Sequence, residues 1–78
     1  MSKTHNINMD SLVFNASITS GTWCDWHSGN KYECGNILFI REYDYVVNKF
    51  TGQKVTAKII RVENNKNGSV FICFKVVS

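Results

Sequence analysis

The chain has 78 residues, of which 44% are hydrophobic and 19% are charged, and its formal net charge is +3. These values describe one small globular domain with a thin core, residues 1–78, and exclude a disordered chain. No apolar run approaches the roughly 20 residues that cross a bilayer, and the polar N-terminus carries no secretory signal. We therefore expect a cytoplasmic monomer with no membrane partner.

The first predicted elements are a short strand and a helix. Residues 4–8 suit a strand, and Asp10 or Asn8 can cap the helix that follows. Ser20 and Gly21 end this helix, because glycine adopts the left-handed conformation of a C-terminal cap. Apolar side chains recur at helical spacing between these signals. Met9, Leu12, Val13 and Ala16 share one helical face, and Phe14 and Ile18 lie on an adjacent face, which predicts a wide apolar stripe.

Four further strands are predicted, at residues 22–27, 36–45, 53–63 and 70–76, with turns at 28–30, 48–52 and 64–68. The apolar alternation of the third of these changes parity near Ile59 and Ile60, which indicates a β-bulge there. Ile59, Ile72 and Phe74 are expected to meet Ile37 or Leu38 in one core. One N-terminal helix and about five short strands indicate an α+β domain, and we expect the strands to close into a barrel.

Residues 34–62 carry a family resemblance. The segments G-N-I-L-F-I-R-E-Y-D and F-T-G-Q-K-V-T-A-K-I resemble the central hairpin of the ASCH domain, a member of the PUA-like superfamily, and T-H-N-I-N and F-N-A-S-I-T-S-G resemble its opening strand and helix. The resemblance implies a small PUA-like β-barrel with a cleft for nucleic acid or a nucleotide.

The ASCH hallmark, G-x-K-x-x-E-x-R after the helix, is degraded in this chain. Aligned without a gap, residues 21–28 keep only Gly21. With one residue deleted, Asp25 and His27 fall on the acidic and basic hallmark positions, but the lysine is still missing. Some family members hydrolyse an acylated cytidine with a lysine, a threonine and a glutamate. Thr22 with Asp25 or Glu42 remains a diverged candidate pair, and we assign no catalytic residue.

Aromatic and charged side chains near the expected cleft are the candidate ligand-binding residues. Trp23 and Trp26 can stack on bases, and their spacing places them on opposite faces of a strand. Arg41 and Tyr43 share a face suited to phosphate and base contact, unless Arg41 pairs with an acidic neighbour such as Glu63 or Asp44. The full set is Trp23, Asp25, Trp26, His27, Arg41 and Tyr43. Lys54 and Lys58 can add a basic stripe for phosphates, although a solvated face is the common fate of such lysines.

Three cysteines, Cys24, Cys34 and Cys73, form an odd set, which we interpret as reduced thiols. With His27 they are zinc-ligand types, but their spacing is no standard zinc signature, so we expect no metal and no cofactor. The preferred function is a non-catalytic module that binds single-stranded RNA or a nucleotide in the ASCH-type cleft. The alternatives are a protein-interaction module, an inhibitor or regulator that uses the same aromatic surface, and a nucleoside amidohydrolase.

Overall fold

The structure, a computed structural model, describes residues 3–28, 31–65 and 67–77. This part of the chain is an α+β fold of one helix and five strands, as predicted. In chain order the elements are β1 (Thr4–Asp10), α1 (Ser11–Ser20), β2 (Thr22–Ser28), β3 (Ile37–Asp44), β4 (Lys49–Asn64) and β5 (Ser69–Val76).

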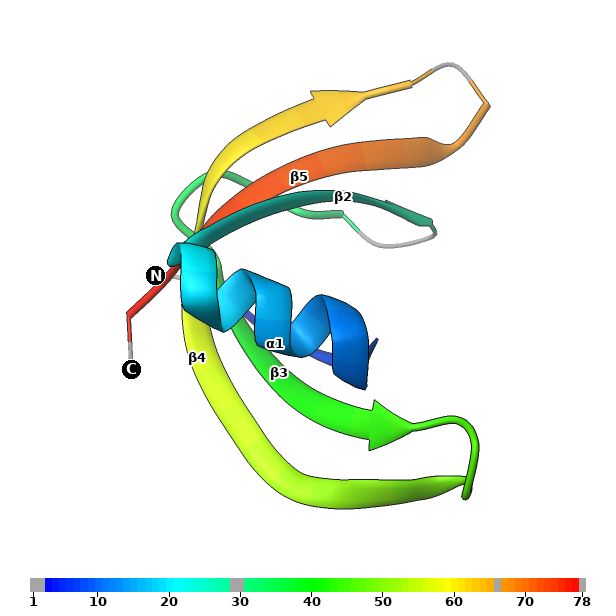
Figure 1. The fold of residues 1–78 in the computed structure, drawn as a ribbon. Helices are drawn as coiled ribbons and strands as arrows, with labels where there is room; N and C mark the ends of the chain where they lie inside the picture. The colour runs from blue at the N-terminus through cyan, green and yellow to red at the C-terminus, as the bar shows by residue number, and fades with distance from the viewer. Residues whose placement is uncertain (1–2, 29–30, 66, 78) are drawn as a thin grey trace.

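The five strands form one mixed sheet in the order β1-β3-β4-β5-β2. Strands β1 and β3 are parallel, and the other neighbouring strands are antiparallel. The first part of the 16-residue β4 pairs with β3 and its last part pairs with β5, so this strand joins the two halves of the sheet. Figure 1 shows β4 bending sharply between these halves, with α1 lying in the space that they enclose. The helix contacts β1, β2 and β3.

A β-bulge accompanies the bend of β4. The pairing of β4 with β5 shifts register between Ile59 and Arg61, so that Ile60 is the extra residue. The bulge predicted near Ile59 and Ile60 is therefore confirmed. Because a bulge increases the local twist and bends its strand, it lets β4 turn from one half of the sheet into the other.

The core lies on the concave side of the sheet. Leu38, Ile59, Ile72 and Phe74 are all buried there in one cluster, which confirms the predicted core. Ile37, the other residue considered for this cluster, has the opposite parity on β3 and is only half-buried. Tyr32, which precedes β3 in the chain, also belongs to the core.

The ends of α1 are as predicted, and its buried face is so in part. The Asp10 carboxylate accepts a hydrogen bond from the Leu12 backbone N–H at 3.0 Å, and Gly21 adopts φ +79° as the C-terminal cap. Of the predicted stripe, Met9 and Phe14 are buried and Val13 packs against the core, but Leu12 is 82% exposed and Ile18 is 41% exposed. The polar Ser17 is buried on the helix instead. The Ser17 hydroxyl donates to the Phe14 carbonyl at 2.8 Å, which satisfies it inside the core and hides the apolar pattern.

The turn between β3 and β4 lies earlier in the chain than predicted. Residues 45–48 form it, and the predicted turn residues Thr51 and Gly52 belong to β4. Asn48 takes the left-handed conformation, with φ +55°, that reverses the chain direction. Of the predicted turn at 28–30, Ser28 ends β2 and residues 29–30 lie outside the described residues. In the turn at 64–68, Gly68 donates its N–H to the Asn65 carbonyl, while residue 66 is not described.

No helix in residues 3–28, 31–65 and 67–77 has the length and apolar character needed to cross a membrane.

Candidate functional site

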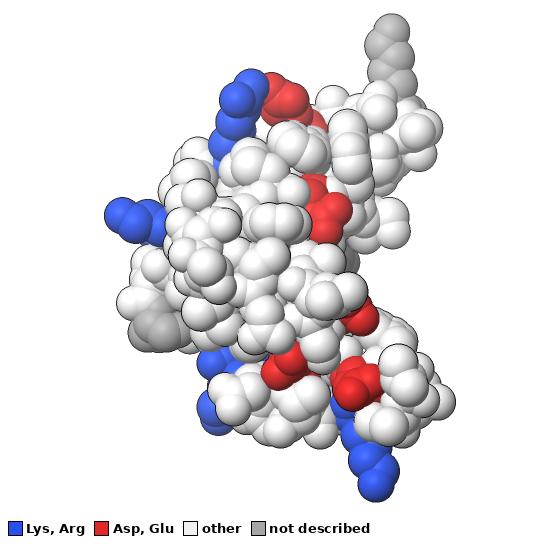
Figure 2. Space-filling view, viewed as in Figure 1, with Lys and Arg blue, Asp and Glu red and all other residues white. Residues whose placement is uncertain are grey.

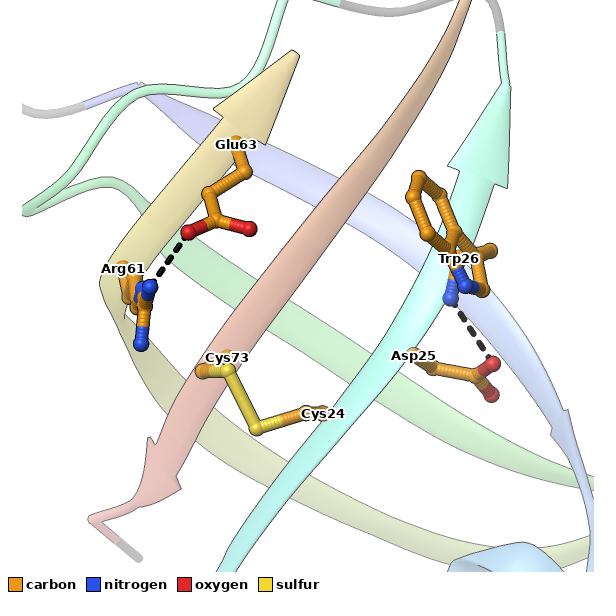
Figure 3. The surroundings of a disulfide bond; sticks show 6 residues. All are labelled: Cys24, Asp25, Trp26, Arg61, Glu63 and Cys73. Atoms are coloured by element: carbon orange, nitrogen blue, oxygen red, sulfur yellow. Dashed lines mark hydrogen bonds and ion pairs between the residues drawn. A yellow bond between two sulfur atoms is a disulfide. The ribbon is translucent and has the colours of Figure 1, made fainter. Parts of the chain in front are cut away.

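Two of the three cysteines form a disulfide, which corrects the prediction of three reduced thiols. Cys24 on β2 and Cys73 on β5 are direct cross-strand partners, and Figure 3 shows their sulfur atoms joined between the two strands. The bridge therefore ties the edge strand β2 to its only neighbour in the sheet. Cytoplasmic localisation stays a prediction, but reduced cysteines no longer support it, because disulfides persist in oxidising compartments.

The third cysteine, Cys34, is free and exposed. Its thiol lies 3.3 Å from the Ile60 carbonyl, to which it can donate a weak hydrogen bond. A disulfide sulfur is no longer a thiolate, so the bridge removes Cys24 and Cys73 from the set of possible zinc ligands. No cluster of three metal-ligating side chains occurs among the residues that the structure describes.

The structure divides the six predicted ligand-binding residues between the two faces of the sheet. Trp23, Asp25 and His27 alternate along β2 on the concave face and are half-buried. Trp26 lies on the opposite face and is 54% exposed, which confirms that the two tryptophans point to opposite sides. Arg41 and Tyr43 also have the outward parity of β3. One ligand on one face cannot contact all six side chains.

Trp26 and its neighbour Asp25 each have a partner close by. The Trp26 ring packs against Phe71 of β5 at a centroid distance of 5.0 Å. The Asp25 carboxylate accepts a hydrogen bond from the Trp26 backbone N–H at 2.8 Å (Figure 3). Since β2 is an edge strand, this bond occupies an N–H that another strand would otherwise use. Asp25 therefore protects the edge of the sheet.

His27 is the most perturbed titratable group in the described part of the chain. Its Nε2 atom is buried and has no hydrogen-bond partner there, and its ring lies 5.7 Å from the Tyr32 ring. Burial lowers the pKa of His27 below its ordinary value of 6.5, and the nearby Asp25 carboxylate offsets part of this effect. The neutral imidazole is therefore the form that the fold favours.

A pH dependence of stability follows from this environment. Because the unfolded chain protonates His27 at a higher pH than the folded chain does, the contribution of His27 to stability is fully present above about pH 6.5 and falls as the pH drops. We expect His27→Gln to flatten the dependence of the unfolding free energy on pH between 7 and 5, measured by urea denaturation. His5→Gln controls for the loss of a histidine elsewhere, and equal pH profiles for the wild type and His27→Gln would contradict the assignment.

The threonine–carboxylate pair considered for a hydrolase is not assembled. Thr22 is exposed and has the opposite parity to Asp25 on β2. Glu42 is 7% exposed on the concave face, where it accepts hydrogen bonds from Thr51 Oγ1 at 2.6 Å and Asn15 Nδ2 at 3.4 Å. The sequence did not indicate Thr51 as a partner of Glu42, because Thr51 was assigned to a turn. The contacts of Glu42 join β3, β4 and α1, which is a structural role.

The outward face of β3, β4 and β5 carries two pairs of cations in direct cross-strand positions. Arg41 lies directly opposite Lys54, and Lys58 lies directly opposite Lys75. Like charges in direct cross-strand positions destabilise a sheet. The register brings no carboxylate into the rows that contain these two pairs, and all four side chains are exposed. We call this surface the basic patch: Arg41, Lys54, Lys58 and Lys75.

Aromatic rings lie among these cations. The Arg41 guanidinium is 3.8 Å from the centroid of the Phe50 ring, and the Lys54 ammonium is 5.7 Å from that of Phe39. The Tyr43 ring contacts Phe50 at 4.9 Å. Arg41 therefore pairs with an aromatic ring, and the acidic neighbour Glu63 pairs with Arg61 instead (Figure 3). Phe39, Phe50 and Lys75 were missed as site residues because only the register of the sheet groups them.

The two signs of charge are unevenly distributed over the face of the molecule that Figure 2 shows. In this view, most of the Asp and Glu side chains lie toward the open side of the bent sheet and most of the Lys and Arg side chains lie away from it, while acidic and basic side chains adjoin at the upper and lower ends. No enclosed pocket is found in the described part of the molecule. A polyanion is therefore better matched by the outward face than by the concave one.

No protein-family model matches the sequence, and no curated protein matches it significantly.

Proposed function

We propose that this protein is a diverged ASCH-type module that binds single-stranded RNA through the basic patch on the outward face of its sheet. The observation that carries the proposal is the pairing of like charges in direct cross-strand positions, Arg41 with Lys54 and Lys58 with Lys75, without a carboxylate in the same rows. Like charges in such positions cost stability in the free protein. Phosphate groups bound between the cations relieve this repulsion and release counterions, which drives association.

The proposed family fold is a PUA-like barrel. Three features support it: the helix between the first two strands, the long bent β4, and the position of α1 against both edge strands, β1 and β2. The segments that resemble the ASCH hairpin form β3 and the first part of β4. The bulge in β4 supplies the twist that a small barrel needs.

The aromatic rings support a single-stranded ligand. Bases of an unpaired strand can stack on aromatic faces and on guanidinium planes, and this stacking requires no particular sequence. The Arg41 guanidinium lies over the Phe50 ring and the Lys54 ammonium lies over the Phe39 ring, so a base can stack on the guanidinium plane or take the place of a cation on its ring. The bases of a duplex are already stacked on one another, so a duplex cannot use these rings. We therefore expect single strands to bind more tightly than duplexes of equal charge.

This proposal moves the binding surface away from the cleft expected from the sequence. Arg41 and Tyr43 remain at the site, whereas Trp23, Asp25 and His27 face the concave side. Trp26 faces outward but lies on β2, and β5 separates that strand from β4. The cations of the patch lie on β3, β4 and β5, so a short strand of RNA crosses the middle of the sheet.

Salt-dependent RNA binding tests the proposal. A labelled single-stranded RNA of mixed sequence should bind in the micromolar range or more weakly at low salt, followed by fluorescence anisotropy. For single strands the logarithm of affinity falls with log salt by about 0.7 per phosphate contact, so Lys58→Ala/Lys75→Ala should reduce this slope by about 1.4. Phe39→Leu should weaken binding and leave the slope unchanged.

A matched variant separates the patch from net charge. Lys3→Ala/Lys31→Ala removes the same two charges from exposed positions outside the patch, and it should retain most of the salt slope. If the two double variants lose the same amount of salt slope, only the net charge of the protein matters for binding. Salt-independent binding of the wild type, or no binding at low salt, would also exclude the proposed site and favour the protein-interaction alternative.

A further inference from the structure

The connection from β4 to β5 contains Asn67 and Gly68, the only asparagine–glycine pair in the sequence. Both residues are exposed, and the connection lies at the outer end of the β4–β5 hairpin (Figure 1). Gly68 has φ +87°, and no described atom beyond its chain neighbours lies within 4 Å of the position that a Cβ would occupy. The backbone nitrogen of Gly68 is therefore shielded neither by a side chain of its own nor by a packed neighbour.

The Asn67 side chain is folded back over the Gly68 peptide. Its carbonyl oxygen Oδ1 accepts a hydrogen bond from the Ser69 backbone N–H at 3.1 Å and a second one from the Ser69 hydroxyl at 2.6 Å. The first bond closes an Asx turn, a ring in which a side-chain carbonyl takes the place of a backbone carbonyl. The Gly68 nitrogen is a member of this ring. The ring therefore holds that nitrogen and the side-chain carbonyl carbon, Cγ, on the same side of the turn.

The hydrogen bonds around this pair favour attack by the nitrogen on the carbonyl carbon. When a nucleophile adds to Cγ, negative charge develops on Oδ1, and donors that already point at this oxygen stabilise it. The backbone N–H and the hydroxyl of Ser69 are two such donors. The Gly68 N–H itself is weakly held, because it donates to the Asn65 carbonyl at 3.4 Å, beyond the usual range of such bonds.

We propose that Asn67 is a site of intramolecular deamidation, with the Gly68 nitrogen as the nucleophile and the Ser69 hydroxyl as a donor to the developing oxyanion. The Gly68 N–H gives its proton to a solvent base, and its nitrogen forms a bond to Cγ of Asn67. The Cγ–Nδ2 bond then breaks, and ammonia leaves with a proton from the solvent, which completes a succinimide ring. Water opens either carbonyl of this ring and gives aspartate or isoaspartate at position 67.

Either product changes the hairpin. Both add one negative charge to a chain whose formal net charge is +3. Isoaspartate also passes the main chain through the former side chain, which lengthens the connection between β4 and β5. Because the loop of a hairpin sets the register of its strands, we expect the isoaspartate form to unfold at a lower urea concentration. No residue of the basic patch takes part in this reaction, so the proposal does not rest on RNA binding.

Peptide mass spectrometry of the purified protein, incubated at mildly alkaline pH, tests the proposal. In the folded wild type, conversion of amide to acid should appear at Asn67. It should not appear at Asn48, which is also exposed in a turn but precedes Lys49, whose side chain hinders the attacking nitrogen. Ser69→Ala should slow the conversion about twofold to tenfold, the range that one hydrogen bond supplies. Ser69→Thr keeps the hydroxyl and should react at nearly the wild-type rate.

The unfolded chain is the matched control for the turn. In guanidinium chloride the Asx turn is lost, so the wild type and Ser69→Ala should react there at equal rates. If Ser69→Ala is slowed equally in the folded and unfolded chains, the local sequence acts without the turn, and the proposal is wrong. An Asn67 amide that stays intact in the folded wild type would overturn it, and so would a folded Ser69→Ala variant that reacts as fast as the wild type or faster. Circular dichroism checks that each variant is folded.

Discussion

Phe74→Ala should unfold this domain or bring it close to unfolding. Phe74 is completely buried on β5, between its cross-strand partners Ile59 and Trp23. Removing a buried phenylalanine ring costs about 3–5 kcal/mol, since the lost burial adds to the cost of the cavity left behind. Small domains are stable by only about 5 kcal/mol or little more. Urea denaturation followed by circular dichroism should therefore show a large loss of the folded state.

Phe71→Ala is the matched control for this experiment. It removes the same side chain from the same strand, but from the outward face, where Phe71 is half-buried and packs on Trp26. We expect a loss well below that of Phe74→Ala. If Phe74→Ala unfolds at the same urea concentration as the wild type, or if Phe71→Ala is the more damaging change, the assignment of the concave face as the core is wrong.

The elements that could be predicted from the sequence are those with a local signal. The strict alternation at residues 70–76 gives β5, and the change of parity at Ile60 gives the bulge in β4. Asp10 and Gly21 bound α1 through backbone chemistry that acts within one turn. In each case the signal and the structure that it specifies lie within a few residues of each other.

Predictions from the sequence failed where a side chain occupies an unusual environment. Ser17 is buried on α1 while Leu12 and Ile18 are exposed, so the apolar stripe indicated only part of the buried face of the helix. Val46 and Val47 have the composition of a strand but form a turn, because the Asp44 carboxylate binds their backbone N–H groups. The turn was consequently predicted too late, at residues 48–52, of which Gly52 lies within β4.

The candidate site depends on register, which one sequence does not reveal. The sequence places Lys54 and Lys58 on one face of β4, as the structure does, but it does not show that Lys75 of β5 lies opposite Lys58. The same limit applies to Cys24 and Cys73, which are separated by 49 positions. Their pairing follows from the alignment of β2 with β5, whereas the odd number of cysteines suggested reduced thiols.

Loss of the Cys24–Cys73 disulfide should give the second large effect on stability. The bridge closes a long loop, across 49 positions of sequence, and holds the edge strand β2 against β5. A cross-link of this kind restricts the unfolded chain and typically contributes about 2–4 kcal/mol. Cys24→Ser/Cys73→Ser should therefore lose about that amount in urea denaturation. A reducing agent should produce the same loss in the wild type, because Cys24 is exposed and gives access to the bond.

The reducing agent also provides the control that identifies the bridge. It should have no effect on Cys24→Ser/Cys73→Ser, where no disulfide remains. It should destabilise Cys34→Ser as much as the wild type, since Cys34 is free and exposed. Wild-type stability that is unchanged by reduction would show that the two cysteines are not bonded, and the double variant would then measure only the loss of two thiols. The Trp26 ring on β2 packs against Phe71 on β5. If reduction also separates β2 from β5, this contact is lost. Tryptophan fluorescence and the free energy of unfolding should then change at the same concentration of reducing agent.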